Sequence, residues 1–498
     1  MFLTGAVSAQ DFDKDVAARF KAFQESAFKE FNDFKESAMK EYIDFVRKSW
    51  KEFTADSPIE IPKDTIMPVF MPDEEREKPI DSKYVQIKEV VKSVPNVRRK
   101  EPVLKIEEVE QSLDKYVQFT FYGARVKVRF DVADKVALSA VDENSIADAL
   151  KTMSGKAYNN MLLDCMRLKR GLDLSDWAYI QLIDSLANSV YANDANGASL
   201  LTAYIYMNSG YKMRLASGNG RLYMLYASEH VIYEQNSFMI DGERYYGTKE
   251  LPIRLNICSA SFKGEEPLSL VITGNQRFAL NISEPRQISS VKYPDFNVSV
   301  RVNRNLLDFY STYPTSMIGD NMLTRWAMYA NTPFDISVAN VLYPALSMKL
   351  KGMSQLEAVE HLLNLVQTGF KYEYDDKVWG SDRIFFADEC LFYPYNDCDD
   401  RSVLFSRLVR DLLGLDVVLV VVPGHILAAV NFTQEVDGNY TMFNDRKFVL
   451  CEPTCTNGAP VGWANIKEGA SLSVIMLERD RNMKSMVIQI SLSNVPDR

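Results

Sequence analysis

Seven prolines spread over residues 58–102 limit the fold of this 498-residue chain more than any other feature of its sequence. They stand among Glu, Asp and Lys residues. A proline inside a helix removes a backbone N–H group, and its ring clashes with the preceding turn, so prolines at this spacing exclude a continuous helix. They favour an extended tether instead. We therefore assign residues 56–110 to a Pro-rich linker that separates the N-terminal segment from the rest of the chain.

The segment before this linker carries an eleven-residue repeat of large apolar side chains. Three series share this period: Phe20, Phe31, Tyr42 and Phe53; Phe23, Phe34 and Phe45; Phe28, Met39 and Trp50. Eleven residues is close to three helical turns, so the repeated side chains form one stripe, with Lys, Glu and Asp on the other face. The pattern predicts an amphipathic helix over residues 10–55. Three partners for the stripe remain open: the protein's own core, self-association or a partner protein through residues 12–55, and a membrane surface.

The first nine residues resemble the end of a secretory signal peptide. Phe2 and Leu3 are followed by small residues that end in Val7-Ser8-Ala9, a pattern that favours cleavage before Gln10. The basic region and most of the apolar region of such a peptide are missing from this stretch. We expect a secreted or bacterial periplasmic protein. No other stretch approaches the ~18 consecutive apolar residues of a transmembrane helix.

The net charge of −10 argues against nucleic acid and anionic membranes as the main partners. The six cysteines are too few for a disulfide scaffold in a chain of this length, although one or two bridges remain open. Cys451 and Cys455 fit either a close pair or part of a metal site. Because the chain has three histidines, none of them near this pair in sequence, we predict no metal. We also predict no organic cofactor.

Patterns typical of strands and of helices alternate after the linker, which predicts an α+β fold. Strand patterns indicate hairpins at 117–131 and 268–282, with turns at Gly123 and Gly274. Helical periodicity appears at about 144–170, 176–190, 337–348 and 354–369.

The length predicts two or three domains, because a single core rarely grows beyond ~250–300 residues. The predicted segments are 1–9, a signal-peptide remnant; 10–55, the amphipathic helix; 56–110, the linker; 111–260, a first unit; 261–330, a β-rich connection; and 331–498, a second unit.

The two units share a weak internal repeat. Residues 191–216 align with residues 395–420 when Gly210 is placed on Gly414, and each stretch reads as polar loop, apolar helix, Gly and strand. Under this alignment Asp194 stands opposite Cys398. The repeat predicts two copies of one fold, the first without the thiol; coincidence remains the alternative, because helix-Gly-strand is a common sequence of elements.

Cys398 stands at the predicted start of a helix. Asp399 and Asp400 suit a helix N-terminus, and an apolar face follows as far as Gly414. Unpaired N–H groups at a helix N-terminus lower the pKa of a thiol, whereas neighbouring carboxylates raise it. A reactive thiol at this position therefore needs a base.

His425 and Glu452 follow Cys398 on two successive predicted strands. A buried strand is predicted at 417–422, and His425 lies at the start of the next strand, 423–432. Glu452 lies at the end of the strand predicted at 447–454, before Pro453. A helix N-terminal Cys, then a His, then a carboxylate is the set of groups that general-base activation of a thiol requires. The His takes the thiol proton, and the carboxylate orients the ring.

Four motifs extend this pattern: FKYEYD, DCDDRSVLFSRLVRDLLGL, PGHILAAV and VLCEPT. In this order and spacing, residues 354–465 resemble the transglutaminase-like superfamily, a branch of the papain-like cysteine peptidase fold. The resemblance implies a Cys-bearing helix packed on an antiparallel sheet, with Cys398 as nucleophile, His425 as base and Glu452 as orienting acid. The family usually has Asp where Glu452 stands. A degenerate second copy is expected around 176–235.

Two hypotheses of function follow. The first is a secreted transglutaminase-like thiol enzyme, a cysteine peptidase or amidase that acts on a protein or peptide through a thioester. The alternative is a non-catalytic binding or assembly protein that uses both folds as scaffolds, which the degenerate copy and Glu452 support. The presence of both Cys398 and His425 favours the enzyme.

Five other residues are weaker candidates. We interpret His361 and His230 as structural, and Trp379 and Tyr393 as packing residues with a cleft-lining role as the alternative. A disulfide between Cys390 and Cys398 would remove the nucleophile.

Overall fold

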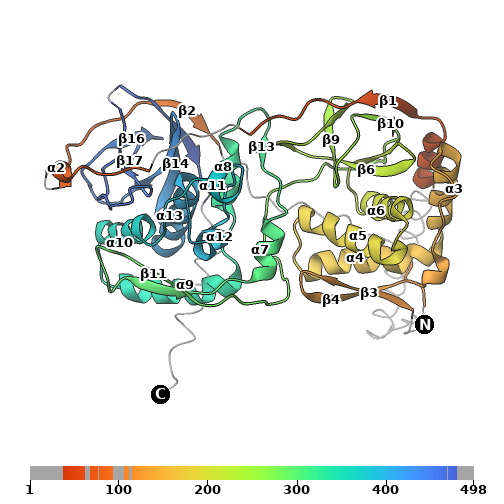
Figure 1. Ribbon diagram of the computed structural model, residues 1–498, viewed down its shortest axis with the longest axis horizontal. Coiled ribbons are helices and arrows are strands. Elements are labelled where there is room, and N and C mark those ends of the chain that lie inside the picture. Colours follow the sequence, from red (N-terminus) through yellow and green to blue (C-terminus); the bar gives the residue numbers. More distant parts are fainter. Residues whose placement is uncertain are drawn as a thin grey trace, which may run out of the picture.

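The computed structural model describes residues 37–61, 68–76, 78–92, 106–110, 115–467 and 469–478. It is a mixed α+β structure, as predicted, with one six-stranded sheet in each half of the molecule (Figure 1). The first sheet has the order β8 (Phe238–Ile240), β9 (Glu243–Gly247), β6 (Arg221–Ala227), β5 (Met213–Gly218), β10 (Arg254–Cys258), β1 (Trp50–Thr54). The second has the order β16 (Tyr440–Phe443), β17 (Arg446–Cys451), β15 (His425–Asn431), β14 (Asp416–Val422), β18 (Leu472–Met476), β2 (Ile87–Val91).

The two sheets have the same strand order. In each sheet, the two central strands form a hairpin with a two-residue turn (β5–β6 and β14–β15). The next two strands of the sheet lie beside the second strand of this hairpin, and a later strand lies beside its first strand. In each, a strand from residues 50–91 completes the edge, antiparallel in the first sheet and parallel in the second. The first hairpin turns at Gly220 and the second at Gly424, both at φ +73°. These turns coincide in the alignment that places Gly210 on Gly414.

The helices before each central hairpin also correspond. The helix α6 (Ala195–Asn208) packs on β5 and β6, and α5 (Asp176–Tyr191) packs on α6. In the second unit, α13 (Cys398–Leu413) packs on β14 and β15, and α10 (Gln355–Thr368) packs on α13. The units differ most in the connection between these helices, which is residues 192–194 in the first unit and 369–397 in the second.

The remaining elements complete the layers around the two sheets. They are α2 (Asp73–Arg76), β3 (Tyr116–Phe121), β4 (Ala124–Arg129), α3 (Glu143–Met153), α4 (Asn159–Gly171), β7 (His230–Ile232), β11 (Arg286–Ser289), β12 (Asn297–Val300), α7 (Arg304–Tyr310), β13 (Ser316–Ile318), α8 (Thr324–Asn331), α9 (Ile336–Leu350), α11 (Asp375–Val378) and α12 (Ala387–Phe392). Two short 3-10 helices occupy Val132–Asp134 and Lys156–Tyr158. In the first unit, α4 and α5 lie between α6 and the β3–β4 hairpin (Figure 1).

The Pro-rich segment is not a free tether, which corrects the linker predicted over 56–110. Residues 87–91 form β2, Val69 forms a bridge with Cys455, and Tyr84 forms one with Tyr440. An extended segment presents N–H and C=O groups along its length, so it can add to the edge of an existing sheet. Asp56 and Ile59 pair with the first unit, and the described residues from Val69 to Val91 run along the second unit. Residues 62–67, 77 and 93–105 lie outside the described part.

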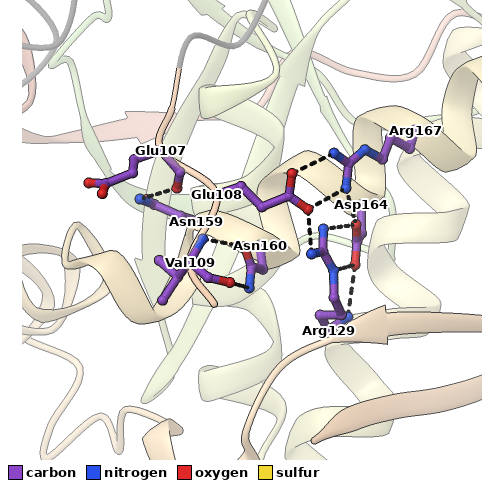
Figure 2. A network of polar contacts seen from close by, with 8 residues as sticks. All are labelled: Glu107, Glu108, Val109, Arg129, Asn159, Asn160, Asp164 and Arg167. Carbon is purple, nitrogen blue, oxygen red and sulfur yellow. Dashed lines mark hydrogen bonds and ion pairs between the residues drawn. The ribbon is translucent and has the colours of Figure 1, made fainter. Parts of the chain in front are cut away.

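Residues 106–110 return the chain to the first unit (Figure 2). The side chain of Asn160 pairs with both backbone groups of Val109, at 2.9 and 2.8 Å. Arg167 forms an ion pair with Glu108 at 3.0 Å, and Arg129 forms a second ion pair with the same carboxylate. These contacts fasten the segment to α4 and β4.

The predicted N-terminal helix ends earlier than expected. Residues 37–46 are helical, but residues 50–54 form β1, so the prediction of a helix as far as residue 55 is wrong. Pairing of β1 with β10 overrides the helical periodicity of the sequence. Met39 and Tyr42 are buried in the core of the first unit, whereas Phe45 is 50% exposed. The described part of the stripe thus packs mainly on its own protein. The predictions for residues 1–9 and 10–36 concern residues outside the described part.

Most other sequence-based elements are present. The hairpin at 117–131 is β3–β4, and it turns at Tyr122 and Gly123, both at positive φ. The predicted helices correspond to α3, α4, α5, α9 and α10, with the run at 144–170 divided into two. The hairpin predicted at 268–282 is wrong: these residues form no paired strands, and Leu268 and Ile282 form bridges with Ser228 and Asn303 instead of with each other. A Cβ on Gly274 would lie 2.6 Å from a carboxylate oxygen of Asp173. Gly274 therefore allows a close approach rather than a hairpin turn. In the described residues, no helix has the length and apolarity to cross a membrane.

Candidate active site

The helix α13 begins at Cys398, as the sequence predicts. The Asp397 N–H group donates to Asp400 Oδ2 at 3.3 Å, which closes the first turn. The helix ends at Gly414, whose φ of +64° is left-handed and whose N–H group donates to Arg410. Cys398 is only 1% exposed and belongs to an apolar core that also includes Ile426. The thiol is therefore at a helix N-terminus but closed off from solvent.

His425 and Glu452 form a hydrogen-bonded pair. His425 Nε2 lies 2.9 and 3.0 Å from the two carboxylate oxygens of Glu452. An ionised carboxylate only accepts hydrogen bonds, so Nε2 carries a hydrogen and Nδ1 of the neutral ring carries a lone pair. Nδ1 is buried and has no hydrogen-bond partner in the described part of the chain. The pair therefore leaves a buried base at Nδ1.

Ser402 connects the first turn of α13 to the strand that carries His425. Its hydroxyl lies 2.7 Å from the carbonyl oxygen of Cys398 and 3.2 Å from that of Ile426, and it donates to both. Ile426 directly follows His425 in β15. The structure thus brings the element that begins with Cys398 against the element that begins with His425.

Glu452 is fixed from the other side by Gln367 of α10, a fully buried side chain. The Gln367 amide donates to the carbonyl oxygens of Glu452 at 2.9 Å and of Ala459 at 3.0 Å, and it accepts from the Ala459 N–H group at 3.2 Å. Arg401 of α13 donates to the Gln367 carbonyl oxygen at 3.0 Å. A chain of hydrogen bonds therefore connects α13 to α10 and α10 to Glu452.

Two opposing effects set the pKa of His425. Burial lowers it, while the charge of Glu452 and the hydrogen bonds to its carboxylate raise it. The raising effects prevail, so the pKa of His425 is above its ordinary value of 6.5. A raised imidazole pKa favours a protonated ring, which stabilises a neighbouring thiolate.

The six cysteines are all free thiols, so neither Cys451–Cys455 nor Cys390–Cys398 is a disulfide. Burial raises the pKa of Cys165, Cys390 and Cys451. Burial also raises the pKa of Cys258 and of Cys455, each to about 11. These five thiols are held in their protonated, unreactive form.

Three carboxylates surround Cys398 in sequence: Asp397, Asp399 and Asp400, with one oxygen of each within 4.8 Å of the others. Carboxylate oxygens can hold a hard cation such as Ca²⁺ or Mg²⁺. Here, however, Asp399 accepts from Trp326 Nε1 at 3.0 Å, and Asp400 accepts from the Phe385 N–H group at 2.8 Å. Burial and the charge of Asp399 raise the pKa of Asp397 and of Asp400. Local hydrogen bonds thus account for Asp399 and Asp400.

Nearby Arg401 is a buried cation. Besides Gln367, its guanidinium donates to the carbonyl oxygens of Asn396 at 3.2 Å and Phe370 at 2.9 Å. Burial lowers the pKa of Arg401 to about 10, so the group is charged at neutral pH. Its positive charge partly offsets the negative charge of the carboxylates around the thiol.

The first unit lacks the three residues of the candidate site. Asp194 stands in the place of Cys398 and caps α6 by accepting from the Gly197 N–H group at 2.9 Å. Arg221, the first residue of β6, stands in the place of His425. The strand β9 pairs with β6 as β17 pairs with β15, and this register places Lys249 where the second unit has Glu452. That arrangement has no thiol and no imidazole, and its one carboxylate, Asp194, caps α6.

The weaker candidates have local contacts of their own. His230 is buried at the start of β7, its Nδ1 lies 3.3 Å from Ser316 Oγ, and burial lowers its pKa to about 4. His361 Nδ1 lies 2.7 Å from the Glu357 carbonyl oxygen. Trp379 and Tyr393 pack edge to face, with ring centres 4.8 Å apart.

Ser402 and Gln367 are site residues that sequence reasoning missed. Ser402 offers one signal, since it stands four residues after Cys398 and so lies one turn along the same helix. Gln367 is a buried polar residue in an apolar helix, but its partner Ala459 is 92 residues away. Nothing local in the sequence identifies that contact.

No protein-family model, curated protein or solved structure matches this chain.

Proposed function

We propose that the protein is a secreted thiol enzyme of the transglutaminase-like type, a peptidase or amidase, with its site in the second of two copies of one fold. The observation that carries the proposal is the state of His425. Its Nε2 is held by both oxygens of Glu452, while its buried Nδ1 has no hydrogen-bond partner among the described residues. An oriented imidazole with one unoccupied nitrogen can serve as a general base for a thiol. Cys398 Sγ is not hydrogen-bonded to Nδ1 in this structure, so the reaction requires the thiol and the ring to come within hydrogen-bond reach when substrate binds.

The reaction proceeds through an acyl-enzyme. His425 Nδ1 takes the proton of Cys398 Sγ, and the thiolate attacks the carbonyl carbon of the substrate. The imidazolium then gives its proton to the departing amine, which leaves a thioester on Cys398. Water or a second amine attacks the thioester after losing a proton to His425, and the thiolate that departs is reprotonated by His425.

Two groups stabilise charge during these steps. Glu452 stabilises the imidazolium through its hydrogen bonds to Nε2. The Cys398 N–H group, at the N-terminus of α13, is the proposed donor to the oxyanion of the tetrahedral intermediate. A protein or peptide is the expected acyl donor, and no metal or organic cofactor takes part.

The shared strand order of the sheets supports a duplicated fold. Helix, central hairpin and flanking strands follow in the same order in both units. Since Asp194, Arg221 and Lys249 replace the three site residues, the first copy serves as a scaffold.

Substrate access requires movement, because Cys398 is only 1% exposed. The connection 369–397 contacts the start of α13: the Phe385 N–H group donates to Asp400, and the Phe370 carbonyl oxygen accepts from Arg401. The first unit has three residues in its place. We infer that this connection covers the thiol and is displaced when substrate binds.

The closed thiol also favours a second candidate function, a non-catalytic binding or assembly protein. In that case the buried Cys398 is a core residue, and the pair of His425 and Glu452 is structural. Fold alone does not decide between the two.

Acylation by p-nitrophenyl acetate distinguishes these functions, since an activated ester needs little substrate recognition. The enzyme hypothesis predicts an acetyl group on Cys398, which peptide mass spectrometry detects. An added alkyl amine should remove this acetyl group. The Cys398→Ser variant should lack this adduct, and Cys165→Ser should retain it. If Cys398 is acetylated no faster than the five other thiols, the non-catalytic function takes its place.

A further inference from the structure

A cavity of about 440 Å³ lies in the first unit, between the helix of residues 37–46 and the helices α3, α4 and α6. Sites for small molecules are typically ~300–1,000 Å³, so the cavity has the size of a ligand site. It is built from residues of the first unit and contains none of the residues of the candidate active site.

The floor of the cavity is apolar with one polar residue. Met39, Ile43 and Tyr204 are buried there, beside Asn208. The Asn208 Nδ2 group donates to the Tyr204 carbonyl oxygen at 2.8 Å. Its Oδ1 is buried and accepts no hydrogen bond from the described part of the chain. This oxygen has almost no accessible surface, so a ligand N–H or O–H group reaches it only after the Asn208 side chain rotates toward the cavity. That contact would relieve the cost of about 1–3 kcal/mol of a buried acceptor without a donor.

The rim of the cavity is cationic. Two of its four cations already form ion pairs: Arg47 with Asp148 at 2.6 Å, and Lys156 with Glu107 at 2.7 Å. Lys40 and Lys151 are exposed and form no ion pair with the residues that the structure describes. The lining carries four cations and two acids: Lys40, Arg47, Lys151 and Lys156; Asp44 and Glu107. With Asp148, the partner of Arg47, the local charge is +1, which on a chain of net charge −10 favours an anion at this place.

We propose that this cavity binds a small organic anion. Its apolar body packs on Met39, Ile43 and Tyr204, and an N–H or O–H group donates to Asn208 Oδ1. Its acid group, a carboxylate, sulfonate or phosphate, lies at the rim between Lys40 and Lys151. This site is independent of the proposed thiol chemistry.

Two fluorescent probes of matched shape test the proposal on the full chain. Anilinonaphthalene sulfonate has an apolar body, an N–H donor and an acid group, and phenylnaphthylamine has the same body and donor without the acid. The proposal predicts saturable binding of one sulfonate probe per chain, and weaker binding of the neutral probe. Equal affinity for both probes, or the absence of saturable binding, would overturn it.

Variants locate the binding. The double variant Lys40→Gln/Lys151→Gln should weaken the sulfonate probe about tenfold and leave the neutral probe unchanged, because both lysines are exposed and only the charge is lost. Asn208→Leu should weaken both probes. Lys351→Gln, an exposed lysine of the second unit, is the matched control and should change neither. Unchanged sulfonate binding in the double variant would place the probe elsewhere and overturn the proposal.

Discussion

His425 donates its Nε2 hydrogen to Glu452, and both carboxylate oxygens lie within 3.0 Å of that nitrogen. The contact follows from the sheet: His425 begins β15, Glu452 directly follows the end of β17, and these two strands pair antiparallel. The start of one strand therefore lies beside the end of the other. One hydrogen-bonded pair thus determines the tautomer of the ring and leaves Nδ1 as the basic nitrogen.

Replacing Glu452 should lower the pKa of His425. Burial lowers this pKa, and the charge and hydrogen bonds of Glu452 raise it above 6.5. In Glu452→Gln the charge is lost and the burial remains, so the pKa should fall below the wild-type value. NMR titration of the imidazole signals measures the His425 pKa in the wild type and in the variant. The exposed Glu435→Gln is the control, and an unchanged His425 pKa in Glu452→Gln would contradict the pairing.

The same pair should make stability depend on pH. Folding raises the pKa of His425 above its unfolded value of about 6.5, so its contribution to stability is fully present below that pH and is lost as the pH rises through the folded-state pKa. The difference in free energy of unfolding between wild type and Glu452→Gln should be larger at about pH 5.5 than at about pH 9. Urea unfolding at the two pH values measures this difference. The opposite order would show that His425 is not stabilised as a cation.

Gln367 should act on the site through Glu452. In Gln367→Leu the carbonyl oxygens of Glu452 and Ala459 lose their donor, which should cost at least about 2 kcal/mol of stability. Differential scanning calorimetry measures the loss. The exposed Gln287→Leu is the control and should cost little. If Gln367→Leu shifts neither the unfolding temperature nor the pKa of His425, Gln367 does not position Glu452.

Two aromatic residues of one helix test its orientation. Tyr42 is 2% exposed, and Tyr42→Ala should destabilise the protein by about 3–5 kcal/mol through the cavity that it leaves. Phe45 lies on the same helix but is half exposed, so Phe45→Ala should change stability by less than about 1 kcal/mol. Chemical unfolding of both variants decides the matter. Equal losses would mean that the helix buries a different face.

Local patterns in the sequence predicted the elements that depend on local signals. The helices α5, α10 and α13 follow apolar periodicity, and the β3–β4 hairpin follows its Gly123 turn. The strands β1 and β2 could not be predicted in this way, because each forms by pairing with a strand far along the chain. For the same reason, prolines that exclude a helix did not reveal that their segment adds to a sheet.

The candidate site was predictable to a similar extent. The order of Cys398, His425 and Glu452 indicated the pair that His425 and Glu452 form, because strand order brings the two ends together. Gln367 was missed because its contacts depend on how α10 packs against residues 452–459. The catalytic roles themselves stay predictions.

Alkylation of the thiols tests the central claim most directly. With iodoacetamide at about pH 6.5, below the ~8.5 of a free thiol, Cys398 should be labelled faster than any other cysteine, although it is buried. The five other thiols have raised pKa values and should react slowly. His425→Ala should slow the labelling of Cys398, and Glu452→Ala should slow it less, because Glu452 acts only through His425. Peptide mass spectrometry locates and times each label. If Cys398 reacts no faster than Cys165, or reacts equally fast without His425, the protein is not a thiol enzyme of this kind.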